Sequence, residues 1–261
     1  MSGNKRLAII DADSVLYAVA LSAEMCAKGQ GMNGEDMWFE VRTKEDCYQE
    51  VLERLDAKIE KVEAADGIIC LSDQRTWRYD VLPTYKANRE RTRRPPMMVH
   101  LRAQIQDRHP FRMVRLVKTL EADDLCGIAS TSLPKLGFQP IVMSEDKDLL
   151  TIPGYLHQRG ATVEVSLEEA DRQHLYQSLT GDVVDNYKGL PGVGPKKADR
   201  ILDAAKSQTV RDMWTAVVTA FTQHGFSPED ALVQARVARI LRADEWDQNN
   251  KRAILWEPPK R

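Results

Sequence analysis

Short apolar runs alternate along this chain with longer stretches of helical periodicity. Residues 7–10, 67–71 and 139–143 are apolar over four or five positions, which is the length of a buried strand rather than of a helix. Residues 43–63 and 121–136 carry their apolar side chains at helical spacing. Strands that alternate with helices predict an α/β domain with a mostly parallel central sheet.

The last third of the chain has a different pattern. From Leu167 onward the sequence is predicted to be helical, apart from a Gly- and Pro-rich turn at residues 189–195. We therefore predict two parts, an α/β domain over residues 1–166 and a helical region over residues 167–261. Further candidate strands are short and lie before this boundary, at residues 113–116, 155–157 and 162–165.

Composition excludes several classes of protein. Of 261 residues, 43% are hydrophobic and 29% are charged, which predicts a folded chain rather than a disordered one. No apolar run approaches the roughly 18 residues that a membrane span needs, and the N-terminus lacks the apolar core of a signal peptide. The four cysteines show no paired spacing of a zinc ribbon or disulfide framework. We therefore expect a cytoplasmic protein that has no membrane partner.

Charge is unevenly distributed along the chain. The net charge is −2, yet residues 75–118 hold twelve Lys or Arg residues against three Asp or Glu residues, so the remainder is acidic. A basic segment in an acidic chain predicts contact with a polyanion beside a cation-binding site. A solvated basic helix face is the alternative. Because residues 83–107 are polar and interrupted by Pro95 and Pro96, we expect them to lie outside the core.

Acidic residues follow the predicted strands or open the predicted helices. The carboxyl ends of parallel strands meet at one edge of a sheet, so these acids are expected to converge there. Carboxylates within about 4 Å of each other repel by a few kcal/mol per pair, which a folded site tolerates only with bound cations or protonation. Oxygen ligands favour Mg²⁺ or Mn²⁺, and two such ions activate water against a phosphodiester. The set is Asp11, Asp13, Asp73, Glu121, Asp123, Asp124, Asp146, Asp148, Asp182 and Asp185.

Each acid taken alone also has a structural interpretation. An Asp after a strand is commonly a helix cap or turn former, which applies to Asp13 and Asp123. Acids at residues 121–124 complement a helix dipole. The spacing of Asp182 and Asp185 predicts that they share one helix face.

Two other motifs indicate nucleic acid. Tyr85, Lys86 and Arg89 place a stacking ring beside two phosphate ligands, unless they belong to an ordinary surface helix. The segment 189–198 combines a glycine-rich turn with lysines at a predicted helix N-terminus, an arrangement that binds phosphate. It lacks the Walker signature, and a plain turn between helices is its alternative. Its candidate contacts are Gly192, Gly194, Lys196 and Lys197.

The order of these pieces resembles the 5′-nuclease (flap endonuclease-like) family, and within it the 5′→3′ exonucleases of short-tailed podophages. The resemblance runs nearly from end to end. It implies a PIN-like α/β nuclease core, a helical arch, and a helix–hairpin–helix at about residues 182–205. The matching pieces are Ile9 to Asp13, Ser72-Asp73, Trp77-Arg78, Tyr85 to Arg89, Leu120 to Asp124, Ser144 to Asp148, Thr151 to Pro153, and Gly181 to Asp185.

The resemblance also implies a set of site residues. Lys86 and Arg89 match catalytic cations of the arch, and Asp124 is expected to help hold the ion that activates water. Asp13 matches only the phage branch and is a metal ligand or a support for one. One Mg²⁺ or Mn²⁺ ion is assigned to Asp11, Asp73, Glu121, Asp123 and Asp124, and a second to Asp146, Asp148, Asp182 and Asp185. The implied DNA contacts are Arg78, Tyr85, Lys86, Arg89, Arg93, Arg94, Gly192, Gly194, Lys196 and Lys197, with a monovalent cation at the hairpin.

By this resemblance we expect a metal-dependent 5′→3′ exodeoxyribonuclease that acts as a monomer on duplex, nicked or flapped DNA. Flap endonuclease action and ribonuclease H-type action on RNA–DNA hybrids are further expected activities. The biological setting would be phage replication, recombination and host DNA breakdown in the host cytoplasm. Because the arch region is short and contains Pro95 and Pro96, the sequence argues against a long threaded arch.

Two other functions remain open at this point. A haloacid-dehalogenase-like phosphatase would use Asp11 as a nucleophile and Asp13 as a general acid. A catalytically inactive DNA-binding relative is the second. The phosphatase leaves the acids at 121–124 and the basic segment unexplained, and the inactive relative would place repulsive carboxylates beside DNA.

Overall fold

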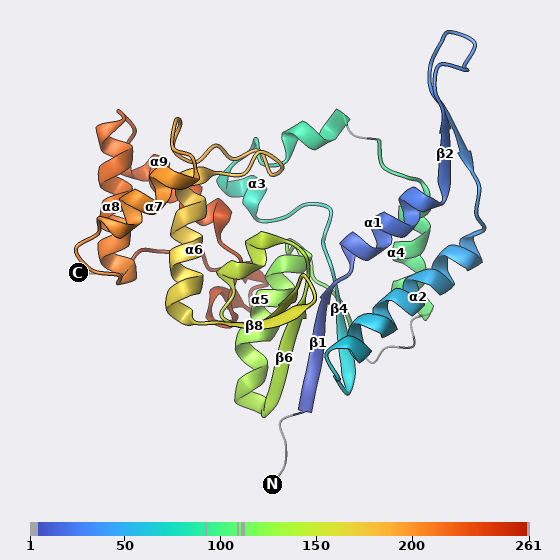
Figure 1. The fold of residues 1–261 in the computed structure, drawn as a ribbon, viewed down its shortest axis with the longest axis horizontal. Coiled ribbons are helices and arrows are strands. Elements are labelled where there is room, and N and C mark those ends of the chain that lie inside the picture. The colour runs from blue at the N-terminus through green and yellow to red at the C-terminus, as the bar shows by residue number, and fades with distance from the viewer. Residues whose placement is uncertain (1–4, 92, 109, 111–112, 260–261) are drawn as a thin grey trace.

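The computed structural model describes residues 5–91, 93–108, 110 and 113–259, with no side-chain description for residues 90 and 91. Its centre is a six-stranded sheet in which five strands are parallel and β8 is antiparallel, as predicted (Figure 1). The strands, in their order across the sheet, are β5 (Met113–Leu116), β4 (Asp66–Leu71), β1 (Lys5–Asp11), β6 (Phe138–Met143), β7 (Gly154–Gln158) and β8 (Ala161–Val165).

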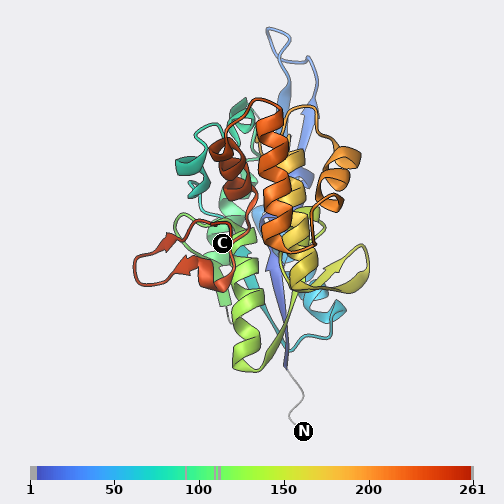
Figure 2. The same ribbon diagram turned by 90° about the vertical axis from the view of Figure 1, so that its left-hand side faces the viewer.

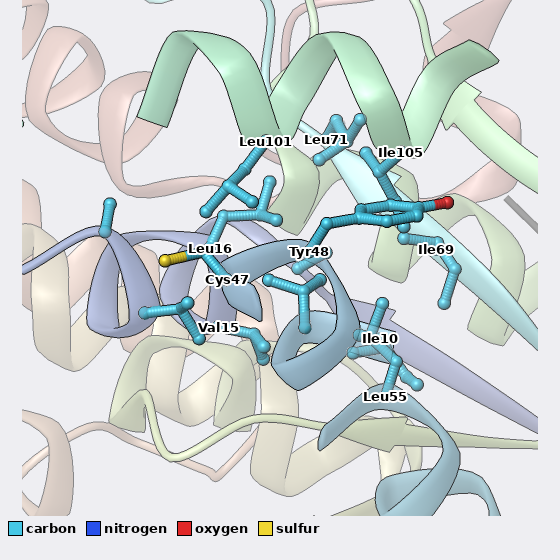
Figure 3. Packing of buried hydrophobic residues seen from close by; sticks show 14 of the residues in the cluster. Ile10, Val15, Leu16, Cys47, Tyr48, Leu55, Ile69, Leu71, Leu101 and Ile105 are labelled. Carbon is cyan, nitrogen blue, oxygen red and sulfur yellow. The ribbon is translucent and has the colours of Figure 1, made fainter. Parts of the chain in front are cut away.

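One face of the sheet is covered by three helices. Alternate residues of β1 explain the two faces, because Ala8 and Ile10 pack against these helices while Ile9 packs on the other side. Thr43 begins the longest of the three by accepting a hydrogen bond from the Asp46 amide. Figure 3 shows their buried side chains interdigitating. The helices are α1 (Asp13–Ser22), α2 (Lys44–Lys61) and α4 (Met97–Arg108).

The helix α4 corrects the expectation that residues 83–107 lie outside the core. Met97, Leu101 and Ile105 recur every four residues and are buried against α1 and α2. Pro95 and Pro96 come just before this helix, where proline is tolerated. The prolines therefore mark a helix start and not a long excursion.

Short elements join these helices to the sheet and to each other. The pair β2 (Glu24–Ala27) and β3 (Met37–Glu40) forms an antiparallel hairpin that projects from the body in Figure 1. The sequence gives no signal for this hairpin, because its side chains do not alternate between apolar and polar. The other short elements are α3 (Arg78–Val81), η1 (Ala87–Arg91), η2 (Leu133–Leu136), η3 (Lys147–Thr151) and η4 (Ala243–Glu245).

The other face of the sheet is covered by α5 (Ala122–Ser132) and by the chain beyond residue 166. Four helices form a bundle with its own core beside this layer (Figure 2). These helices are α6 (Leu167–Thr180), α7 (Pro195–Asp203), α8 (Val210–Gln223) and α9 (Pro228–Ala238). No helix among the described residues is long and apolar enough to cross a membrane.

After α9 the chain returns to the sheet. Ile240, Leu241 and Trp246 are buried with β1, β4 and α5. At Gly127 of α5 an added Cβ would overlap the carbonyl oxygen of Leu241, so this segment lies directly on the helix. It continues into a small hairpin, β9 (Trp246–Asp247) and β10 (Arg252–Ala253), within the region predicted to be all helical. The first 166 residues thus share their core with residues near 240.

Candidate active site

The acidic residues predicted to converge do so at the carboxyl-end edge of the sheet. Asp11 ends β1, and Asp146 follows β6. Glu121 and Asp123 stand at the start of α5, which packs on β1 and β4. The parallel strands point toward the connection between α3 and α4 (residues 82–91 and 93–96), which we call the strap (Figure 1).

Three carboxyl groups at this edge have strongly raised pKa values. Burial, followed by the charges of Asp13 and Asp146, raises the pKa of Asp11 to about 7. Burial, followed by the charges of Asp11 and Glu121, raises the pKa of Asp123 well above its usual range. For Asp148, burial and then the charges of neighbouring acids raise the pKa to about 7. Asp123 therefore lies close enough to Asp11 to be repelled by it, and Asp148 is repelled by Asp146 and Asp182, without full compensation in either place.

The donor set fits hard divalent cations, although the ligands are not preassembled. All of its donors are carboxylate oxygens, which are the groups that Mg²⁺ and Mn²⁺ prefer. Within the described part of the chain, no three His, Cys, Asp or Glu side chains already form a group that could hold one ion. A bound ion would thus require side-chain rotation or water ligands.

Glu121 belongs to a second, compensated network. Its carboxylate accepts hydrogen bonds from Arg78 and the Tyr85 hydroxyl, each at 2.9 Å, and from the Lys86 ammonium. Burial acts to raise the pKa of Glu121, but the charges of Arg78 and Lys86 outweigh it and lower that pKa overall. Glu121 is therefore ionised and held in place by three donors.

The structure does not support Asp124 as a metal ligand. Its side chain is fully buried, and its two oxygens accept five hydrogen bonds, from Trp77 Nε1, two nitrogens of Arg78, and the Glu121 and Leu241 amides. Both oxygens are therefore occupied by donors. Asp124 instead ties α3, α5 and the returning C-terminal segment together.

Arg78 and Tyr85 are also not DNA contacts in this structure. Arg78 is 3% exposed and donates to Asp124, to Glu121 and to the carbonyl oxygens of Val237 and Arg239. Tyr85 is 1% exposed, and its ring packs among Tyr187 and neighbouring residues. Burial by residues more than 100 positions away removes both side chains from reach of a polymer.

Two further acids are engaged by backbone amides. Asp13 accepts from the Ser72 amide and from Arg102 of α4, and its own amide donates to Asp11 at 3.1 Å. Asp13 therefore positions Asp11 through its amide, and its own carboxylate is already engaged rather than free to bind a metal ion. Asp73 accepts from the amides of Gln74 and Thr119, each at 2.8 Å.

The second predicted group of acids lies beside a turn, not on a helix. Asp182 accepts from the amides of Val184 and Asp185 within a loop (residues 182–187) closed by paired hydrogen bonds between Asp182 and Tyr187. The expectation that Asp182 and Asp185 share a helix face is therefore wrong, because α6 ends at Thr180.

The loop 182–187 and η3 nevertheless bring these acids close together. Gln177 of α6 donates to Asp148 at 2.6 Å, and Lys147 lies 3.4 Å from Asp182. Gln177 and Arg102 are partners that the motifs did not identify. Their spacing in the sequence gives no indication of the contact.

The base of the strap rests on loop 182–187. The Lys86 amide donates to the Asp185 carbonyl at 2.9 Å, and Asn88 donates to the Val183 carbonyl at 2.8 Å. Arg89 donates to the Asp185 carboxylate at 2.6 Å. The expected arch cations, Lys86 and Arg89, are thereby fixed at the acidic edge.

The far end of the strap is held by the β2–β3 hairpin. Arg93 forms a bidentate ion pair with Glu24, and its guanidinium carbon lies 4.2 Å from the centre of the Trp38 ring. Its expected DNA contact would therefore compete with these interactions. Arg94 is exposed and remains a predicted DNA contact.

The glycine-rich turn lies between α6 and α7. Gly192 has φ +79°, a value that favours glycine. Gly194 has φ −93° and precedes Pro195 at the start of α7, so it does not need a left-handed conformation. Lys196 and Lys197 are exposed, and Lys197 also donates to the Gly192 carbonyl. The predicted phosphate contacts and the cation at this turn stay predictions.

The chain is similar to known proteins over most of its length. A family model described as 5′-3′ exonuclease, N-terminal resolvase-like domain, matches residues 6–157. The exodeoxyribonuclease of Enterobacteria phage T3 and the exonuclease of Escherichia phage T7 are each 25% identical to this chain, covering 98% of it and 94% of the relative. The T5 D15 protein co-crystallised with metal ions superposes with a TM-score of 0.66 at 14% identity, over 90% of this chain and 89% of that one, and so shares the fold.

Proposed function

Because this chain belongs to the 5′-3′ exonuclease family with an N-terminal resolvase-like domain, we propose that its acidic edge hydrolyses phosphodiesters of DNA from 5′ ends with two divalent cations, Mg²⁺ or Mn²⁺. The observation that carries the proposal is the crowding of buried carboxyl groups at this edge, where Asp11 repels Asp123, and where Asp146 and Asp182 repel Asp148. Such repulsion is costly unless bound cations or protons relieve it.

Two groups of carboxylates are proposed to hold the ions. Bound ions of this kind activate water and stabilise charge at the leaving oxygen of a phosphodiester. Glu121 joins the first group after its hydrogen bonds rearrange. The first group is Asp11, Glu121, Asp123 and Asp146, and the second is Asp148, Asp182 and Asp185. Asp73 stays a candidate ligand through water, and Asp13 and Asp124 are proposed to position the others.

The strap is proposed to supply positive charge to the reacting phosphate. Lys86 and Arg89 are fixed next to the acidic edge by Glu121 and Asp185. A guanidinium and an ammonium held there can donate hydrogen bonds to phosphoryl oxygens as charge develops on them. Their loss would therefore slow the chemical step more than it weakens DNA binding.

The turn before α7 is proposed to grip the duplex away from the cleavage point. The α7 N-terminus carries Lys196 and Lys197 on the surface, and helix N-termini attract phosphate. Changing both lysines to Ala should weaken duplex binding and flatten the dependence of log K on log salt by about two. Single-turnover cleavage at saturating enzyme should survive.

The structure argues against the phosphatase alternative. That reaction would need Asp13 as a free general acid, but Asp13 is bonded to the Ser72 amide and to Arg102. A small phosphomonoester substrate separates the two functions directly, because only the phosphatase would hydrolyse it.

The decisive experiment is digestion of 5′-labelled and 3′-labelled substrates in Mg²⁺, with EDTA as the control. Duplex, nicked, flapped and RNA–DNA substrates should release short products from their 5′ ends, and the RNA–DNA arm tests hybrid cleavage. Equal release from 3′ ends, or full activity in excess EDTA, would contradict the proposal. Gel filtration during the same preparation checks the proposed monomer.

A further inference from the structure

Two cations of the strap are bonded to two carboxylates that the proposed function assigns to metal ions. The Lys86 ammonium contacts Glu121 and lies 3.6 Å from an oxygen of Asp185. The other oxygen of Asp185 accepts from Arg89 at 2.6 Å. The Tyr85 hydroxyl lies between the same two carboxylates, 2.9 Å from Glu121 and 2.7 Å from Asp185.

The bonds of Lys86 are more sheltered from water than the bond of Arg89. The side chains of Lys86 and Glu121 are 16% and 7% exposed, and that of Asp185 is 20% exposed. Ion pairs at the surface contribute little because solvent and salt screen them, whereas a partly buried pair is screened much less. The Lys86–Glu121 pair is therefore strong enough to oppose another cation at the same oxygens.

We propose that Lys86 and Arg89 act as internal counter-ions that compete with divalent cations for Glu121 and Asp185. A carboxylate oxygen that accepts from an ammonium or guanidinium is less available to a metal ion. Conversely, a metal ion that takes Glu121 or Asp185 releases the positive group toward a phosphate. The inference rests on the proposed function, and it adds that the catalytic cations lower the intrinsic affinity of the site for metal.

Lys147 provides a matched control from the same cluster. Its ammonium lies 3.4 Å from Asp182, but its side chain is 66% exposed. Loss of Lys147 removes the same formal charge beside Asp182, a different acid of the same proposed site. If only the overall electrostatic field at the site mattered, loss of Lys86 and loss of Lys147 would change the affinity for metal equally. Competition at the ligand oxygens predicts a much larger effect for Lys86.

The test is calorimetric titration of the DNA-free full-length chain with Mn²⁺. Lys86→Met should bind Mn²⁺ about tenfold more tightly than the unaltered chain, the order expected for one charge-assisted hydrogen bond. Arg89→Met should tighten binding less, because its side chain is 41% exposed. Lys147→Met should stay within about twofold of the unaltered chain.

A second variant guards against misfolding at this position. Lys86 has φ +53°, which Asn tolerates better than Met, so Lys86→Asn should reproduce the tighter binding while near-ultraviolet circular dichroism confirms a native fold. Unchanged or weaker Mn²⁺ affinity in both folded variants would overturn the inference, as would equal tightening by Lys147→Met. Metal-dependent cleavage by the unaltered chain would still stand in either case. Absence of Mn²⁺ binding by the unaltered chain would overturn both proposals.

Discussion

Asp123 and Asp124 are neighbours in the sequence but belong to electrostatically opposite regions. Asp123 faces acids that raise its pKa well above the usual range, after burial as the largest cause. Asp124 is fully buried and accepts five hydrogen bonds, two of them from Arg78. Adjacent residues of a helix point about 100° apart. This is enough to place Asp123 at the acidic edge and Asp124 in a buried network with Trp77 and Arg78, which we call the hub. Two aspartates thus have opposite environments according to what surrounds them, and only Asp123 is proposed to bind metal.

The largest expected effect is on DNA cleavage at the acidic edge. Asp123→Asn removes a proposed metal ligand and should slow single-turnover cleavage of a nicked duplex by a hundredfold or more. Because it also removes repulsion, the free energy of unfolding at pH 8 should stay equal or rise. A variant that cleaves normally would remove Asp123 from the site.

The second effect separates the hub from the edge. Asp124→Asn leaves the buried Arg78 with only part of its countercharge, so the free energy of unfolding should fall by about 3–5 kcal/mol. Denaturant unfolding of the two Asn variants side by side measures the contrast. If Asp124→Asn is as stable as the unaltered chain, Asp124 does not hold α3, α5 and the C-terminal segment together.

A third, smaller effect on stability tests the C-terminal segment around Leu241, which packs on α5 at the hub. In Gly127→Ala the new methyl group would overlap the Leu241 carbonyl, and the backbone cannot move away cheaply. Overpacking of this kind costs about 1–3 kcal/mol. Thermal melting should show the loss, while Gly137→Ala, where an added Cβ meets nothing within 4 Å, measures the strain of a positive φ alone. No loss of stability in Gly127→Ala would mean that the contact with Leu241 is unimportant.

A fourth effect is a pH dependence confined to the edge. The folded pKa of Asp11 is about 7, above the ordinary value of 3.8, so between these pH values the folded chain binds more protons than the unfolded chain. Stability without metal should therefore fall as pH rises from about 4 to 7 and level off above it. Asp11→Asn should flatten this slope in melting curves, whereas a slope that is identical in both proteins would contradict the raised pKa.

The sequence was sufficient for the sheet and for the convergence of acids at its edge. Strand positions follow from short apolar runs, and parallel strands bring Asp11, Glu121 and Asp146 to one side. The same reasoning could not separate Asp123 from Asp124, because the distinction depends on Arg78 and on a chain segment 117 positions away at Leu241.

Other errors came from local signals with two meanings. Pro95 and Pro96 indicate a break in the sequence, but they precede a helix whose Met97, Leu101 and Ile105 are buried. The spacing of Asp182 and Asp185 fits a helix as well as a turn, and the hydrogen bonds of the Asp182 side chain to the amides of residues 184 and 185 favour the turn. Tyr85 resembled an exposed stacking ring because nothing nearby in the sequence shows that Tyr187 and Val237 cover it.

The most direct test of the metal-binding edge is thermal melting of the DNA-free chain at pH 8 during a Mg²⁺ titration, at constant ionic strength. Binding to the folded state alone should raise the melting temperature progressively with Mg²⁺ concentration, by several degrees in the unaltered chain and in Lys147→Met, and by much less in Asp123→Asn. A melting temperature that follows ionic strength only, with the same response in all three proteins, would contradict the assignment of divalent cations to these carboxylates.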